Sequence, residues 1–255
     1  MNRRTFLGTA GVAGVGALAG CMNAIGTVAP PQVPQSALDE GGWTRTNRST
    51  ETVFEESYGP VTVTAKSTTL TFSDQRLAQS ITEKTLGQID GTMAIYAASH
   101  INFSPDLNNL PAAVGREEVV NRAEKQAKDQ FKQRMRDKGL TNVRETGEEP
   151  FQTDSGKSPG LTTFSAEFPV GTLTYDAGGE SFEIEVGSIA VAGDLAVWNE
   201  DDYVVVAGGA YPAENYAKTT KKQLSEAITV TVDIDLGLTP QQYKQEVRNL
   251  MAATR

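Results

Sequence analysis

Residues 195–207 read LAVWNEDDYVVVA, and this stretch decides the fold class of the chain. Leu195 to Trp198 is a short apolar segment, Asn199 to Asp202 is a polar loop of four residues, and Tyr203 to Ala207 is apolar throughout. Two apolar segments joined by a short polar loop predict a β-hairpin. Because its second segment does not alternate with polar residues, we expect a central strand that is covered on both faces.

Further strands are predicted on both sides of this hairpin. They are rich in β-branched residues, and glycine-containing turn signals separate them at residues 58–60, 177–179 and 193–194. The predicted strands cover residues 52–57, 61–72, 92–103, 161–170, 172–175, 181–191 and 229–236. Gly208 to Pro212 is interpreted as the exit from the central strand into a helix that ends near Glu226. The alternative is a close approach of this backbone to another chain.

One long helix is predicted between the two strand-rich parts, from Arg116 to Lys138. Its apolar residues recur every four positions, at Val119, Ala123, Ala127, Phe131 and Met135. Shorter helices are predicted after Ser73, which is interpreted as an N-cap, and after Thr239, where Thr-Pro-Gln-Gln predicts a capping box.

Because strands follow strands along most of the chain, the sequence predicts an α+β fold. We expect a curved, mainly antiparallel sheet with one long and two or three shorter helices packed on it. The layout resembles the PsbP/Mog1-type α-β-α sandwich.

The N-terminus has the features of an export signal. Arg3 and Arg4 directly precede an uncharged stretch from Phe6 to Ala19, which is too short to span a bilayer as a helix. Paired arginines before a weakly hydrophobic stretch resemble a twin-arginine signal. The stretch closes on Leu18-Ala19-Gly20-Cys21, which resembles a lipobox, so Cys21 is expected to carry the lipid after cleavage. Stable anchoring requires two lipid chains on Cys21.

The sequence therefore divides into three parts. Residues 1–20 are predicted to be the signal peptide, residues 21–50 the lipidated cysteine with a flexible tether rich in Pro, Gly and Thr, and residues 51–255 a single α+β domain. We expect the domain to lie on the extracytoplasmic face of the cell membrane, held by the lipid on Cys21.

The composition excludes several classes of protein. Of the 255 residues, 38% are hydrophobic and 22% charged, which is typical of a globular domain and not of a disordered chain. The net charge of −9 argues against a nucleic-acid partner, because such proteins need a basic face for phosphate. One cysteine and one histidine leave no set of residues for a disulfide or a His-based metal site.

The acidic residues do not form a recognisable catalytic motif. Glu183 and Glu185 share one strand face, as any residues two apart do, and Asp233 and Asp235 match a calcium loop only in part. His100 is the only histidine, and no nucleophile motif accompanies it. We therefore assign no catalytic residue, no cofactor and no metal ligand.

Two further features concern the surface of the exported domain. Asn47 and Asn102 each begin a tripeptide that accepts N-linked glycans, Asn47-Arg48-Ser49 and Asn102-Phe103-Ser104. The long helix is locally basic, so it either meets an acidic partner or lipid headgroup, or presents a solvated face; the mixed charges favour the solvated face.

The chain resembles a haloarchaeal family of twin-arginine-exported lipoproteins of unknown function. The resemblance rests on the signal, on the lipobox, on residues 101–111 and on residues 197–212. It implies no catalytic residues. We expect a lipid-anchored, non-enzymatic binding or structural module whose protein or small-molecule partner is unidentified. The alternative is a cell-surface hydrolase that uses carboxylates or a metal. It would require two or three acidic residues to converge in one pocket, from the set Glu183, Glu185, Asp194, Asp233 and Asp235.

Overall fold

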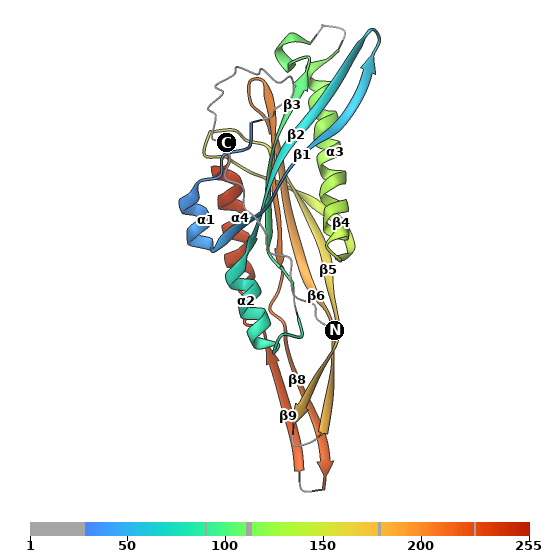
Figure 1. The fold of residues 1–255 in the computed structure, drawn as a ribbon, viewed down its shortest axis with the longest axis vertical. Helices are drawn as coiled ribbons and strands as arrows, with labels where there is room; N and C mark the ends of the chain where they lie inside the picture. The colour runs from blue at the N-terminus through green and yellow to red at the C-terminus, as the bar shows by residue number, and fades with distance from the viewer. Residues whose placement is uncertain (1–28, 90, 111–113, 178–179, 227) are drawn as a thin grey trace, which may run out of the picture.

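The computed structural model describes residues 29–89, 91–110, 114–177, 180–226 and 228–255. Seven strands form one antiparallel sheet in the order β1-β2-β3-β7-β6-β5-β4, and helices cover both of its faces (Figure 1). This confirms the predicted α+β class, with one long helix and three shorter α-helices. The strands are β1 (Trp43–Tyr58), β2 (Val61–Asp74), β3 (Ile95–Ser104), β4 (Thr141–Pro150), β5 (Gly160–Ala177), β6 (Glu180–Asn199), β7 (Tyr203–Pro212), β8 (Ala217–Ser225) and β9 (Ile228–Asp235). The helices are α1 (Gln35–Gly41), α2 (Gln75–Lys84), α3 (Arg116–Asp137) and α4 (Pro240–Ala253), with a short 3₁₀ helix at Leu107–Asn109.

The predicted hairpin of β6 and β7 lies at the centre of the sheet. The two strands pair from Val191 with Pro212 to Asn199 with Val204, and β7 is the fourth of the seven strands. Val204 and Val205 point to opposite faces, as neighbours in a strand do, and both have no exposed surface. The prediction of a central strand covered on both faces is therefore confirmed.

One face of the sheet, here called the α4 face, is covered by α1, α2 and α4 (Figure 1). Val247, Leu250 and Met251 of α4 are at most 1% exposed, and they belong to one apolar cluster with residues of β3 and β7. The hydroxyl of Tyr96 on β3 lies within hydrogen-bonding distance of the carbonyl of Leu250 and the hydroxyl of Thr254. The end of the chain is thus tied to the centre of the sheet.

The opposite face, here called the α3 face, is covered by α3 alone (Figure 1). Ion pairs connect α3 to both edges of the sheet. Two of them reach β1 and one reaches β4: Arg122 with Glu56 (3.3 Å), Arg134 with Glu51 (2.6 Å) and Lys128 with Glu148 (3.0 Å). Part of the basic character of the long helix is therefore used within the domain, because these cations lie beside acidic side chains of the edge strands.

The flexible tether predicted for residues 21–50 is wrong for residues 29–50. Within that range Gln35–Gly41 is α1, and β1 begins at Trp43. Gln32 exchanges two backbone hydrogen bonds with Arg255, so this segment is part of the domain. The composition is misleading because β1 is an edge strand: most of its side chains up to Ser57 are solvated, and its polar sequence looks like a linker.

Two predictions in the second half of the chain are also wrong. Residues 217–225, expected to be helical, form β8, which pairs with β9 in a separate hairpin. The turn expected at residues 193–194 lies inside the continuous strand β6. Gly193 does not turn the chain there. A Cβ at this position would lie 3.1 Å from the ring of Phe131, so the missing side chain allows α3 to pack closely on the strand.

The ends of some elements differ from their predicted form. The N-cap of α2 is Asp74, whose carboxylate accepts a hydrogen bond from the N–H of Leu77 at 3.0 Å, and not Ser73. α4 begins at Pro240 as predicted, but the Thr239 hydroxyl does not cap it and contacts Oε1 of Gln242 instead.

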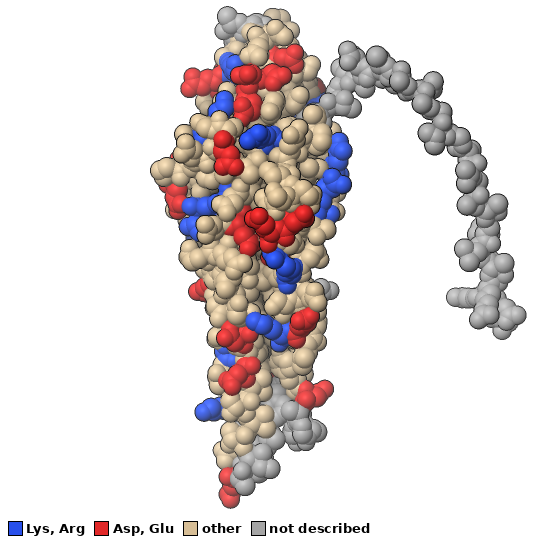
Figure 2. Space-filling model, turned by 90° about the vertical axis from the view of Figure 1, so that its left-hand side faces the viewer, with Lys and Arg blue, Asp and Glu red and all other residues tan. Residues whose placement is uncertain are grey.

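The far half of the β5–β6 hairpin (residues 171–177 and 180–187) and the strands β8 and β9 extend together from one end of the molecule, and we call them the distal arm (Figure 1). The hydroxyl of Tyr216 donates to the carbonyl of Val186 at 3.2 Å and links the two hairpins. On the face that carries α1, α2 and α4, acidic and basic side chains are interspersed (Figure 2). Among the described residues, none of the helices has both the length and the apolar character needed to cross a membrane.

Candidate functional site

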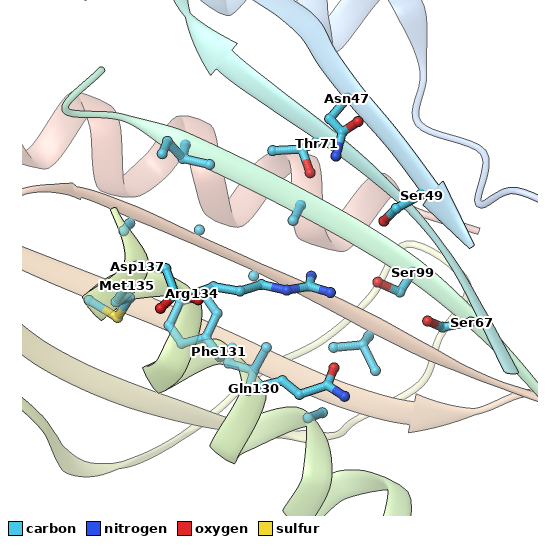
Figure 3. A pocket seen from close by; sticks show the side chains of 18 of the residues that line it. Asn47, Ser49, Ser67, Thr71, Ser99, Gln130, Phe131, Arg134, Met135 and Asp137 are labelled. Atoms are coloured by element: carbon cyan, nitrogen blue, oxygen red, sulfur yellow. The ribbon is translucent and has the colours of Figure 1, made fainter. Parts of the chain in front are cut away.

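A cavity of about 570 Å³ lies between α3 and the sheet (Figure 3). This volume falls within the range of small-molecule sites, roughly 300–1,000 Å³. The cavity exists because small residues replace large ones along the α3 face of three neighbouring strands. On β2 this face changes from Val63 and Ala65 to Ser67, Thr69 and Thr71.

The neighbouring strands change at the same level of the sheet. On β3 the α3 face changes from Phe103 and Ile101 to Ser99 and Ala97, and on β7 from Val204 and Val206 to Gly208 and Ala210. The register brings the small residues together, since Thr71 pairs with Ala97 and Ala97 with Gly208. The floor of the cavity is therefore a set of short side chains in register across three strands.

Apolar clusters at the two ends of α3 hold the helix over this floor. Val119 and Ala123 pack near the beginning of the helix against the ends of β2 and β3. Phe131 and Met135 pack near its end with Phe164 on β5, whose ring centroid lies 5.1 Å from that of Phe131. Between them α3 presents the small Ala127 to the cavity. The helix is thus held by apolar contacts at both ends, and the cavity lies beside its second half, from Ala127 onward.

One side of the floor carries polar side chains that the protein itself does not satisfy. Four side chains of β1 and β2 line the cavity and make no hydrogen bond to another described group: Asn47, Ser49, Ser67 and Thr71. Ser67 is only 3% exposed. The next hydroxyls inward, Thr69 Oγ1 and Ser99 Oγ, bond to each other at 2.7 Å. Buried hydroxyls normally have partners, so the free groups are available to water or a ligand.

Two acidic and two basic side chains form the rim of the cavity: Glu51, Arg134, Asp137 and Lys138. Nη2 of Arg134 lies 2.6 Å from Oε1 of Glu51, and both side chains are more than 40% exposed. Figure 3 shows the Arg134 side chain extending from α3 across the cavity. The formal charges of these four side chains cancel.

The acidic residues considered for catalysis do not converge at this cavity. Glu183, Glu185, Asp233 and Asp235 lie in the distal arm, and none of them lines the cavity. Within the described ranges no group of three or more His, Cys, Asp or Glu side chains is placed to hold a metal ion. The convergence required by a carboxylate or metal-dependent hydrolase is not seen in this part of the chain.

Asp194 is buried on the α4 face, at 2% exposure. It accepts hydrogen bonds from the Tyr211 hydroxyl at 2.9 Å and from Nε of Arg248 at 2.7 Å. Arg248 also pairs with Glu149 at 2.9 Å. Burial, together with the Asp194 charge, raises the pKa of Tyr211, so its hydroxyl stays protonated and keeps donating. This network joins β6, β7, β4 and α4 and has a structural role.

His100 also lies on the α4 face and therefore away from the cavity. It is 7% exposed, and its ring centroid lies 4.5 Å from that of Tyr203. Burial lowers the pKa of His100, although backbone hydrogen bonds with Arg255 and Ala29 and the charge of Glu200 oppose the shift. A neutral, packed imidazole at the meeting point of the two ends of the domain is part of the core.

The remaining predicted sites are separate from one another. Asn47 and Asn102 are both exposed and lie on β1 and β3, and a glycan on Asn47 would stand at the mouth of the cavity. Their glycosylation stays a prediction. Arg3, Arg4 and Cys21 lie outside the described residues.

The cavity residues were not identifiable from any one segment of sequence. Gly208 begins the motif Gly-Gly-Ala-Tyr-Pro, and its interpretation as an exit from the strand into a helix is wrong. A Cβ on Gly208 would lie 2.7 Å from the carbonyl oxygen of Asp194, and one on Gly209 would lie 2.8 Å from a methyl group of Val247. The strand continues through the motif to Pro212.

A comparison with protein families finds one match. The model of a domain of unknown function, DUF6517, matches residues 30–255. No curated protein and no solved structure matches the chain. The resemblance to the PsbP/Mog1-type sandwich and to haloarchaeal lipoproteins therefore stays a prediction.

Proposed function

The chain belongs to this family of unknown function, and from that premise we propose that it is a lipid-anchored, extracytoplasmic binding protein that takes a small molecule between α3 and the sheet. The observation that carries the proposal is the cavity of about 570 Å³ whose floor holds unpaired polar side chains. Tightly packed cores do not leave such a space, and a binding site requires one.

The proposed location rests on the sequence of residues 1–21. Arg3 and Arg4 precede the apolar stretch, and Cys21 is the only cysteine of the chain. Seven residues separate Cys21 from Ala29, and a fully extended chain of that length reaches at most about 29 Å. The domain is thus held closer to the bilayer than a tether to residue 50 would allow.

The fold suggests an orientation for the anchored domain. The first described residues lie beside the C-terminus, since Gln32 pairs with Arg255. Figure 1 places the C-terminus toward the end of the molecule opposite the distal arm. In the proposed arrangement the anchored end faces the membrane and the distal arm points away from it.

The location is tested by two variants. Cys21→Ser is expected to release the exported protein from the membrane fraction, and Arg3→Lys with Arg4→Lys is expected to retain the unprocessed chain in the cell. An immunoblot of cell fractions measures both. A Cys21→Ser chain that keeps its membrane fraction and an unprocessed size would rule out the lipoprotein assignment.

Binding is tested with a neutral, environment-sensitive dye, N-phenyl-1-naphthylamine, added to the full chain carrying Cys21→Ser. The dye should fluoresce on entering the cavity, and Ala97→Leu should reduce its affinity at least about tenfold, because the larger side chain fills the floor. Ala213→Leu adds the same volume at an exposed position and is the matched control. Equal dye binding by wild type and Ala97→Leu would contradict the proposed site.

The alternative of a carboxylate or metal-dependent hydrolase has no observation in its favour among the described residues. The acidic side chains that it would need are spread over the distal arm and the buried Asp194 network.

A further inference from the structure

We propose that the ligand of this cavity is an uncharged amphipathic molecule, with a hydroxyl-bearing end over β1 and β2 and an apolar end against α3 and β6. The inference rests on the proposed function and specifies the chemistry of the ligand. Three properties of the cavity carry it: the distribution of polar groups on the floor, the position of the apolar wall, and the balance of charge at the rim.

The polarity of the floor changes in order across the sheet. One row of paired residues on the α3 face runs from β1 to β6: Asn47, Thr71, Ala97, Gly208 and Leu195. The next row begins with hydroxyls at Ser49, Thr69 and Ser99 and ends with Val206. In both rows the polar residues lie on the side of β1 and the apolar residues on the side of β6. A ligand lying across the strands would meet these two environments at its two ends.

The polar end offers hydrogen bonds from neutral side chains, beside a Glu51 carboxylate that Arg134 already pairs with. Asn47 supplies an amide, which both donates and accepts, and Ser49, Ser67 and Thr71 supply hydroxyls, which do the same. Ser67 is the most informative of them, because it is 3% exposed, lines the cavity and has no partner in the described part of the chain. Because each of these groups can both donate and accept a hydrogen bond, they are suited to bind hydroxyl groups of a ligand.

The apolar end is formed mainly by α3 and β6. Phe131 and Met135 line the cavity from the helix, and Leu195 lines it from the sheet. Figure 3 shows Phe131 and Met135 on the other side of the cavity from Ser49 and Ser67. An alkyl or ring portion of the ligand would remove its surface from water there.

The rim disfavours a charged ligand of either sign. Arg134 already pairs with Glu51, and Asp137 and Lys138 add one charge of each sign. An anionic group at the polar end would approach Glu51, and a cationic group would approach Arg134. A neutral group meets neither repulsion and leaves the ion pair in place.

The test measures the affinity of four probes by titration calorimetry, with the full chain carrying Cys21→Ser and each amphiphile below its critical micelle concentration. Octyl β-glucoside has a neutral polyhydroxyl end and an alkyl end, octanoate and octyltrimethylammonium have charged ends, and glucose lacks the alkyl end. We expect octyl glucoside to bind at least about tenfold more tightly than the other three. Ser67→Ala should weaken it about three- to tenfold, as expected for one lost hydrogen bond.

Thr172→Ala removes a hydroxyl from the exposed surface of the distal arm and is the control for Ser67→Ala; it should leave the affinity unchanged. Tighter binding of octanoate or octyltrimethylammonium would overturn the inference of a neutral ligand. Equal affinity of Ser67→Ala and wild type for octyl glucoside would overturn the assigned polar end. Either result leaves the cavity itself standing if the neutral dye still distinguishes Ala97→Leu from wild type. Loss of that distinction would instead contradict the proposed function.

Discussion

The two faces of the central sheet are built from the same strands and packed in opposite ways. On the α4 face, three helices cover the sheet. Large side chains at this contact are almost fully buried, such as Tyr96 of β3 and Leu250 and Met251 of α4. On the α3 face, one helix covers the sheet, and a cavity of about 570 Å³ stays open beneath its second half. The comparison shows that one face of the sheet supplies dense packing while the other keeps an open cavity.

The largest expected effect on the unfolding free energy comes from breaking the buried ion pair on the α4 face. Arg248 pairs on the α4 face with Asp194, whose side chain is 2% exposed. Arg248→Met should cost about 3–5 kcal/mol of unfolding free energy, because it leaves a buried carboxylate without its cation. Urea unfolding measures the loss. A cost below about 1 kcal/mol would show that Tyr211 alone satisfies Asp194 and would remove this contrast between the faces.

A matched pair of methionines compares the packing directly. Met251 has no exposed surface on the α4 face, and Met135, 4% exposed, lines the cavity on the α3 face. Met251→Ala should cost about 2–5 kcal/mol, since it creates a new void in a filled core. Met135→Ala should cost about half as much, because the space beside it is already open. The denaturant midpoints of the two variants measure both losses, provided that the slopes of the unfolding curves are equal. Equal losses of unfolding free energy would mean that the cavity does not lower the cost of truncating Met135.

The reverse substitution is made on neighbouring alanines of β3. Ala98 has no exposed surface and points to the α4 face, and Ala97 points into the cavity. Ala98→Leu should destabilise the fold by about 1–3 kcal/mol through overpacking. Ala97→Leu should change the stability by less than about 0.5 kcal/mol, because the cavity accepts the added atoms. Thermal unfolding of the two variants decides the point, and a comparable loss in both would indicate that the cavity is closed in solution.

The same two faces explain what could be predicted from the sequence. The β6–β7 hairpin and α3 were predictable because burial makes their apolar residues continuous or periodic. The edge strands β1 and β4 were not fully predictable, since solvent covers much of their surface and their polar residues look like a linker or loop. The sequence pattern of a strand reveals the strand through its buried residues, and an edge strand has few buried residues.

The cavity was not predictable for a different reason. Its floor combines Thr71, Ala97 and Gly208, which are remote in sequence and meet only through the register of three strands. Each small residue alone is unremarkable in its strand. The absence of a catalytic motif led to the hypothesis of a binding module, but the position of the cavity depends on strand pairing that a single sequence does not encode locally.

A smaller, pH-dependent difference is expected from His100 on the α4 face. Burial lowers its pKa in the folded chain, whereas in the unfolded chain it is near 6.5. The unfolded state therefore binds the proton first as the pH falls, and stability is lost below about pH 6.5 until the pH passes below the folded pKa. The slope from this group is at most about 1.4 kcal/mol per pH unit. Unfolding free energies of wild type and His100→Gln between pH 5 and 8 should diverge in this direction; parallel profiles would exclude the contribution.

The smallest expected effect is that of the ion pair on the α3 face, which is the counterpart of Arg248 and Asp194. Arg134 and Glu51 are both more than 40% exposed, so water competes for each charge and salt screens the pair. A double-mutant cycle with Arg134→Met and Glu51→Gln should give a coupling of about 0.2–1 kcal/mol that vanishes at 1 M salt. A larger coupling that persists in salt would mean that this pair holds α3 over the sheet. Because apolar clusters already support both ends of the helix, we expect the pair to shape the entrance of the cavity more than it stabilises the fold.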